Sequence, residues 1–170
     1  MDALAIGLGV VVSNYRAQVI TVSTRAASGE RADTSGTVLV QALTDIGFDC
    51  APAIVIPDGP EVAEAITGAV DAGFDVVITT GGTGLTPKDN TPEYTQPLLD
   101  REIPGIADSI RAYGVAQGIP TAVLSRGVSG QRGRSLIINA PGSPGGAKDA
   151  IAVIAPIIVH ALDQINGGDH

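Results

Sequence analysis

The sequence predicts an α/β domain of three layers: a mostly parallel, doubly wound sheet with helices on both faces and a small antiparallel hairpin extension. Three observations predict it. Short runs rich in β-branched residues alternate with segments of helical periodicity. Residues 75–80 contain a run of valine, isoleucine and threonine after Asp75, as expected of a central parallel strand that is covered on both faces. The 22 glycines and 11 prolines stand mostly at the ends of these runs, where they mark turns.

The first half of the chain contains two predicted strand–helix units. Residues 18–23 are rich in β-branched side chains, which indicates a strand. Apolar side chains then recur at helical spacing through residues 38–46, and Gly47 suits the left-handed position that ends a helix. Residues 53–56 predict the next strand, and a second helix is expected across residues 58–73.

The second half begins with the central strand at residues 75–80, which a long glycine-containing loop follows. Thr91 suits the N-cap of a helix and Pro92 its first position, with helical spacing continuing to about residue 116. Residues 121–124 and 135–139 predict two more strands.

Glycines in residues 126–134 indicate a hairpin, and the last helix is expected to begin after residue 146 and to bend at Pro156. We predict an N-terminal extension over residues 1–16 and one domain over residues 17–170. The apolar run in the extension is interpreted as a strand or a tail, because no basic segment precedes it as in a signal peptide.

Composition excludes several classes of function. A net charge of −8 and 3% aromatic residues argue against binding to nucleic acid, and no apolar run is long enough to span a membrane. The single cysteine, Cys50, cannot form an internal disulfide, which fits a cytoplasmic protein. Half of the ten basic residues flank two glycine-rich loops, which indicates a small anionic ligand: Lys88, Arg126, Arg132, Arg134 and Lys148.

The first of these loops follows the central strand and contains Gly81, Gly82, Thr83 and Gly84. Glycines let the backbone approach a ligand closely and turn its N–H groups toward an anion. The loop matches neither a Walker A motif nor the dinucleotide fingerprint, whose third glycine is replaced by Pro87. A tight turn without a ligand is the alternative.

Asp89 follows this loop, and Asp58 ends another strand expected at the same edge. A carboxylate beside bound phosphate requires a divalent cation between them, so both aspartates are candidate ligands of Mg²⁺. Asp89 can also be a surface carboxylate, and Asp58 an ordinary helix N-cap.

The second loop joins a strand to the last helix and contains Pro141, Gly142, Ser143 and Pro144. Free N–H groups at the start of that helix and the Ser143 hydroxyl can hold a second phosphate, although a plain strand–helix connection has the same composition. His160 and Cys50 are interpreted as structural residues, because neither has a recognisable catalytic partner in sequence.

Taken in order, these motifs resemble the Mog-type molybdopterin adenylyltransferases, which include the gephyrin G domain. The resemblance covers about residues 17–165 and is carried by the following segments: 22–25, 33–36, 80–84, 89–93, 104–105, 125–126 and 141–144. It implies a homotrimer that transfers the adenylyl group of ATP to the terminal phosphate of molybdopterin with Mg²⁺. Pyrophosphate would be released, and the product would be handed to a molybdenum-inserting enzyme.

The resemblance assigns roles by position. It makes Asp58 and Asp89 the two essential aspartates. The remaining assignments are nucleotide binding for Gly81, Gly82, Thr83 and Gly84, and molybdopterin binding for Asp33, Ser35, Ser125, Pro141, Gly142, Ser143 and Pro144.

Three positions depart from the family pattern. Thr24 stands where many relatives have aspartate, Lys88 where they have arginine, and Asn90 where they have valine. Two alternative functions stay open: a molybdopterin-binding scaffold without catalysis, and a nucleotide pyrophosphatase like the competence-damage-associated proteins.

Overall fold

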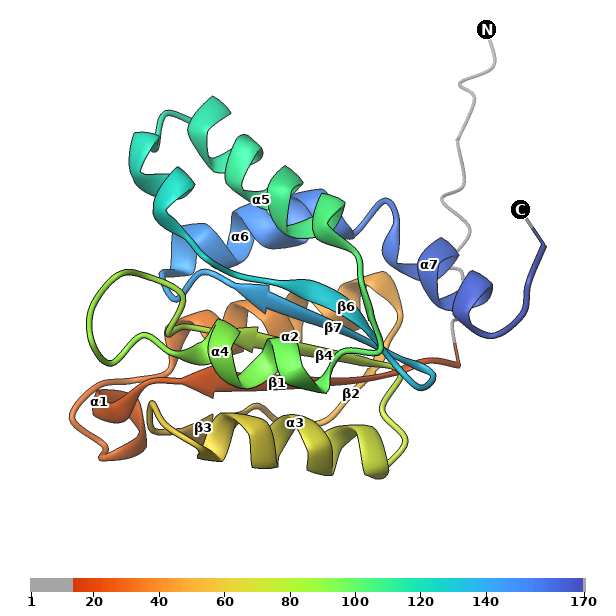
Figure 1. Ribbon diagram of the computed structural model, residues 1–170, viewed down its shortest axis with the longest axis horizontal. Helices are drawn as coiled ribbons and strands as arrows, with labels where there is room; N and C mark the ends of the chain where they lie inside the picture. The colour runs from red at the N-terminus through yellow and green to blue at the C-terminus, as the bar shows by residue number, and fades with distance from the viewer. Residues whose placement is uncertain (1–13, 170) are drawn as a thin grey trace, which may run out of the picture.

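The computed structural model describes residues 14–169, in which seven strands form one mixed sheet (Figure 1). The strands are β1 (Arg16–Val22), β2 (Asp49–Cys50), β3 (Ile54–Ile56), β4 (Val76–Thr80), β5 (Arg101–Glu102), β6 (Ser129–Arg132) and β7 (Ser135–Ala140). Their order is β2-β1-β4-β7-β6-β5, and β3 pairs with β1 beside β2. β1 pairs in parallel with β2, β3 and β4, and β4 with β7, whereas β6 runs antiparallel to both β5 and β7.

Helices cover both faces of this sheet (Figure 1). They are α1 (Thr24–Ala27), α2 (Thr34–Ile46), α3 (Glu61–Asp71), α4 (Thr91–Thr95), α5 (Pro104–Ala116), α6 (Pro144–Ile154) and α7 (Ile158–Ile165), with short 3-10 turns η1 (Gln96–Leu98) and η2 (Pro120–Leu124). Side chains of α2, α5, α6 and α7 pack on one face, and those of α3 and α4 on the other. The prediction of a three-layer, doubly wound domain with a hairpin extension is confirmed.

Alternation along the strands divides the core between the two faces. In β4, Val76 and Ile78 face the layer of α2, α5 and α6, whereas Val77 faces α3. All five residues of β4 are buried, as its continuous apolar run predicted. The core is therefore deepest at the centre of the parallel part of the sheet, where β4 lies between β1 and β7.

Local signals set several helix ends as predicted. Gly47 ends α2 at a φ of 108°, a left-handed conformation that glycine adopts without steric cost. The final helix breaks around Pro156, and α6 and α7 meet at a bend of 60°. No single helix within residues 14–169 has the length and apolarity to cross a membrane; the bent α6–α7 pair meets that test only by length and composition.

Three local predictions are wrong. The last helix begins at Pro144 rather than after residue 146, because the Ser143 side chain caps it. Residues 121–124, predicted as a strand, lie in the 3-10 turn η2, which Pro120 starts. Val123 and Leu124 are exposed, and no strand among residues 14–169 pairs with this segment. Thr91 is the first residue of α4 rather than its N-cap, which is Asn90. The strand or tail expected in residues 3–12 lies outside the described residues.

Candidate functional site

The carboxyl ends of β1, β3, β4 and β7 meet at one edge of the sheet, and both glycine loops leave from it (Figure 1). The Gly81 amide donates to the Ala140 carbonyl at 3.2 Å, and the Thr80 hydroxyl donates to the Pro141 carbonyl at 2.7 Å. A Cβ on Gly142 would lie only 3.0 Å from the Cα of Gly81. The sheet therefore brings the two loops together.

The first loop depends on glycine at two positions. Gly81 and Gly82 have φ values of 107° and 67°, and a Cβ on Gly82 would collide with the Thr91 hydroxyl. That hydroxyl is buried and has no hydrogen-bond partner among the described residues. The same hypothetical Cβ would lie 3.1 Å from Asp58 Oδ1, so the two oxygens converge on Gly82.

Backbone N–H groups of this loop remain available for a ligand. Within residues 14–169, no protein acceptor pairs with the amides of Gly82, Thr83 or Gly84. The carbonyls on the opposite side are occupied instead: the Thr91 amide donates to Gly82 O at 3.0 Å, and the Arg126 amide to Thr83 O at 2.8 Å. Protein contacts thus hold the loop through its carbonyls and leave its amides available as donors, as an anion site requires.

Asp89 closes the end of the loop. Its Oδ2 accepts a 2.9 Å hydrogen bond from the Thr86 amide, and its own amide donates to Thr86 O at 3.0 Å. Asp89 Oδ1 has no partner among the described residues, and the side chain is only half-buried. Asp89 is therefore an oriented carboxylate with one free oxygen, rather than a solvated surface group.

Asp58 approaches from the end of β3. Its Oδ2 accepts from the Thr24 hydroxyl at 3.0 Å and from the Thr24 amide at 3.3 Å, and its own amide donates back to the Thr24 hydroxyl at 3.2 Å. It does not cap α3, whose N-cap is Pro60 with no side-chain bond. The threonine that departs from the family pattern thus fixes one oxygen of Asp58, a partnership that sequence alone did not reveal.

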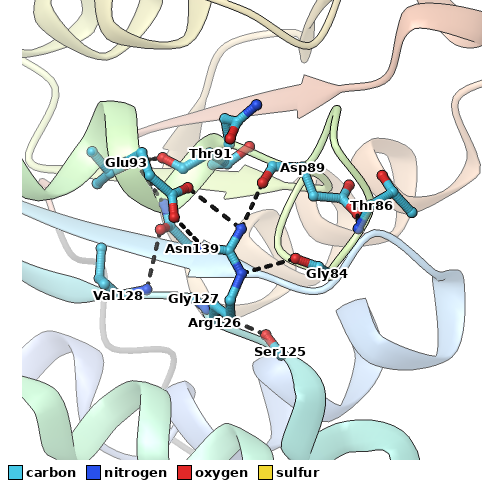
Figure 2. A network of polar contacts seen from close by, with 12 residues as sticks. Gly84, Thr86, Asp89, Thr91, Glu93, Ser125, Arg126, Gly127, Val128 and Asn139 are labelled. Atoms are coloured by element: carbon cyan, nitrogen blue, oxygen red, sulfur yellow. Dashed lines mark hydrogen bonds and ion pairs between the residues drawn. The ribbon is translucent and has the colours of Figure 1, made fainter.

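Arg126 joins three segments of the site through its guanidinium group (Figure 2). Its Nε donates to Gly84 O at 2.9 Å, and an Nη donates to Asp89 O at 2.5 Å. The group also forms an ion pair with Glu93 of α4, and this contact lowers the pKa of the Glu93 carboxyl. Arg126 therefore holds the loop in shape instead of offering a free positive charge.

The second loop forms the start of α6. Ser143 is the N-cap, and its hydroxyl accepts from the Gly146 amide at 3.0 Å. The amide of Gly145 has no acceptor within the described part of the chain. Pro144 is the first helical residue and needs no hydrogen-bond partner. Across from it, the Ser125 hydroxyl donates to Thr83 Oγ1 at 3.3 Å, which links the segment before β6 to the first loop.

Asp33 and Ser35 lie beside the sheet edge from which the two loops leave, and Asp33 also stabilises α2. Asp33 caps α2 by accepting from the Gly36 amide at 2.9 Å, and its other oxygen accepts from the Thr21 hydroxyl at 2.9 Å. Both residues line a small hollow of about 30 Å³ that also includes Gly142 and Pro144. Asp33 is thus the N-cap of α2.

A cavity of about 590 Å³ contains most of the predicted groups. Its walls include Gly82, Thr83, Gly84, Asp89, Ser125, Pro141, Gly142 and Ser143. This volume lies in the ordinary range for small-molecule sites. Asp58 is not among its lining residues, although its Oδ1 lies close to Gly82, which is one of them.

The expectation that Arg132 and Arg134 flank the glycine-rich loops is wrong. Arg132 and Arg134 lie in the β6–β7 turn, at the opposite end of β7 from the loops, where Arg134 bonds to Asn166. His160 is exposed and contacts Gln164 on the same helix. Cys50 is only partly buried against the core, and its burial raises the pKa of the thiol. Cations therefore contribute less at this edge than the sequence suggested.

A sequence family described as "Probable molybdopterin binding domain" matches residues 18–160. The chain belongs to this family. A molybdopterin adenylyltransferase of Pyrococcus furiosus is 36% identical over 87% of this chain and 89% of its own length. A solved molybdopterin biosynthesis Mog protein from Mycobacterium ulcerans is 50% identical, with a TM-score of 0.85 over 89% of this chain and 99% of that one. The resemblance drawn from the motifs is confirmed.

A longer relative also matches. A molybdenum cofactor biosynthesis bifunctional protein of Chlorobaculum tepidum is 32% identical over 91% of this chain. The present chain spans only 50% of that protein's length. The match therefore concerns this domain, and the activity of the whole relative is a separate question.

Proposed function

We propose that this domain transfers the adenylyl group of ATP to the terminal phosphate of molybdopterin. The observation that carries the proposal is the placement of two phosphate-sized cradles on one cavity: the free amides of Gly82–Gly84 on one side and the start of α6 on the other. Two phosphate-bearing reactants need two such cradles side by side. The relatives named for this reaction support the choice.

The reaction needs no protein nucleophile. An oxygen of the molybdopterin phosphate attacks the α-phosphorus of ATP, the bond from that phosphorus to the bridging oxygen of the β-phosphate breaks, and pyrophosphate leaves. The chain therefore contributes alignment and charge stabilisation. We assign the triphosphate to the amides of Gly82, Thr83 and Gly84, and the acceptor phosphate to Ser143 and the Gly145 amide.

Asp89 and Asp58 suit a magnesium ion. The free Oδ1 of Asp89 and the Oδ1 of Asp58 beside Gly82 are hard oxygen donors, and Mg²⁺ takes one or two carboxylates together with phosphate oxygens. The buried, unpaired Thr91 hydroxyl adds a polar group on the same side of Gly82. When bound, the ion would neutralise charge on the triphosphate; the aspartates would hold it against the loop.

We further propose that the domain works in the cytoplasm as a homotrimer and passes its product to a molybdenum-inserting enzyme. These points extend the family resemblance. Light scattering on the purified chain tests the trimer: a mass near three times 17.1 kDa is expected, and a monomeric mass would overturn it.

One assay tests the activity against its two alternatives. The protein is incubated with molybdopterin, ATP and Mg²⁺, and both pyrophosphate and adenylylated pterin are followed. Pyrophosphate that appears only with molybdopterin supports adenylyl transfer. Release without acceptor identifies a pyrophosphatase, and binding without turnover identifies a scaffold.

Asp89→Ala is the matching variant. We expect it to keep the fold, because the side chain is half-exposed, and to lose turnover. Asp71→Ala, at an exposed position in α3 on the opposite face of the sheet, is the control. Full turnover in Asp89→Ala would remove this carboxylate from the mechanism.

A further inference from the structure

The Thr91 hydroxyl is buried beside the first glycine loop without a hydrogen-bond partner. The residue is only 1% exposed. Within residues 14–169, its Oγ1 is the one buried side-chain oxygen or nitrogen atom that lacks a partner. Buried polar groups are almost always paired, because taking a hydroxyl out of water without a new bond costs free energy. The hydroxyl therefore lowers the stability of the fold unless another state of the protein supplies an acceptor.

Backbone contacts fix Thr91 against the loop. Its amide donates to Gly82 O at 3.0 Å, and its carbonyl accepts from the Thr95 hydroxyl at 2.7 Å. The Thr95 hydroxyl in turn accepts from the Asn139 side chain of β7 at 3.1 Å. Thr91 is thus tied to the glycine loop through its amide and to the core of the sheet through its carbonyl.

The Thr91 hydroxyl lies close to a free oxygen of Asp58. A Cβ on Gly82 would collide with Thr91 Oγ1 and would lie 3.1 Å from Asp58 Oδ1. Because Gly82 has no side chain, both oxygens face the same small space. Asp58 Oδ2 accepts from Thr24, whereas no group among the described residues donates to Oδ1. A donor without an acceptor therefore lies near an acceptor without a donor.

Other acceptors fit the hydroxyl less well. The carboxylate of Asp89 lies at Gly84 rather than at Gly82, since its Oδ2 would be 2.9 Å from a Cβ on Gly84. Gly82 lines the cavity of about 590 Å³, but neither Thr91 nor Asp58 is among the lining residues. The surroundings of Thr91 therefore indicate Asp58, rather than a molecule in that cavity, as the acceptor.

We propose that Thr91 is a positioning residue that donates a hydrogen bond to Asp58 Oδ1 when ATP and magnesium are bound. The role of Asp58 in this proposal rests on the proposed function. The two oxygens do not form a hydrogen bond in the structure, so the carboxylate must move a short way toward Gly82. With Thr24 on Oδ2 and Thr91 on Oδ1, a donor at each oxygen would fix the plane of the carboxylate. Each carboxylate oxygen can accept more than one bond, so Oδ1 would still be able to bind a cation.

The isosteric variant Thr91→Val separates this role from a structural one. Its melting temperature is expected to equal or exceed that of the natural chain, because the deleted hydroxyl is buried without a partner. Turnover is expected to fall about 10-fold, while the dissociation constant of ATP stays within about 2-fold. Thr91→Ser keeps the hydroxyl and should restore turnover to within about 3-fold of the natural chain.

Two other threonines serve as controls. Thr95→Val deletes a buried hydroxyl that is paired with two groups and should melt at a lower temperature. Thr44→Val makes the same change at an exposed position of α2 and should leave turnover unchanged. A lower melting temperature for Thr91→Val, or full turnover in that variant, would overturn the proposal.

A double-variant comparison tests whether Thr91 acts through Asp58. Single-turnover rates are measured for Asp58→Ala and for Asp58→Ala combined with Thr91→Val. If the hydroxyl acts through this carboxylate, the two rates should agree within about 2-fold. A further loss of about 10-fold in the double variant, with weaker ATP binding, would place the hydroxyl on the nucleotide instead and overturn the proposal.

A crystal structure with α,β-methylene-ATP and Mg²⁺ gives a readout without turnover. The distance from Thr91 Oγ1 to Asp58 Oδ1 is expected to be about 2.7 Å, and an unpaired hydroxyl would overturn the proposal. The two proposals also fail separately. If this bond forms but no adenylylated pterin is made, the reaction is wrong and the Thr91–Asp58 contact stands. If transfer occurs and Thr91→Val reacts normally, only the role of Thr91 is wrong.

Discussion

Replacing Arg126 with alanine tests how the first glycine loop keeps its shape. The guanidinium bonds to Gly84 O and Asp89 O and pairs with Glu93. The Arg126 and Glu93 side chains are 35% and 50% exposed, so solvent screening limits the ion pair itself to about 0–1 kcal/mol. The two carbonyls lose charge-assisted hydrogen bonds, which contribute about 1.5 kcal/mol each at the low end of the usual range. The loop is therefore expected to lose about 3 kcal/mol of restraint.

The lost restraint on the loop is expected to lower activity, because the groups that align the reactants can then move. A displacement of about 1 Å in a group that aligns reactants can cost about 100-fold in rate, and Arg126→Ala frees the carbonyls beside both the loop amides and Asp89. We expect kcat/KM for pyrophosphate release to fall by about 100-fold and ATP affinity to fall with it. Glu93→Gln keeps a hydrogen-bond acceptor and should cost less than about 5-fold.

The assay combines steady-state pyrophosphate release, ATP binding and thermal melting. Arg126→Ala that melts at a lower temperature yet binds and turns over ATP normally would refute the reasoning, because the loop would then be held by other contacts. The direction in which the contribution of the Arg126–Glu93 ion pair changes with pH follows from the pKa of Glu93. Since the ion pair lowers the pKa of Glu93, its contribution is complete above the ordinary glutamate value of about 4.3 and is lost only as the pH falls through the lower, folded value.

Three further predictions concern single groups. Gly82→Ala should lower stability by at least about 1–2 kcal/mol and impair ATP binding, because a positive φ and the Thr91 hydroxyl both oppose a side chain there. The control, Gly68→Ala in α3, should stabilise the chain by roughly 0.5–1 kcal/mol, and equal melting temperatures for the two variants would contradict this reasoning. Thr24→Val removes the hydroxyl bonded to Asp58 and should slow turnover by about 10-fold while ATP still binds, with the exposed Thr44→Val as control; unchanged turnover would show that Asp58 needs no such partner. Because burial raises the pKa of Cys50, its thiol should react more slowly with a disulfide reagent at pH 8 in the folded chain than in urea, and equal rates would exclude that protection.

Much of the fold could be predicted because its signals are local. The apolar run of β4, the left-handed glycine after α2 and the bend at Pro156 each depend on residues close together in the chain. Parallel strands also send their carboxyl ends to one edge, so the meeting of the two loops followed from strand order. Residues 121–124 were mistaken for a strand because a short apolar run carries no periodicity that separates a strand from a turn.

The site was predictable in its residue types but not in its partnerships. Sequence placed Asp58, Asp89 and the glycines at strand ends, since backbone conformation and strand termini are encoded nearby. Only the tertiary structure decided that Arg126 is neutralised by Glu93 and that Thr24 holds Asp58. Those contacts depend on how segments distant in the chain meet. The fold decides which groups surround a charged side chain, and these groups determine whether it is paired or available to a ligand.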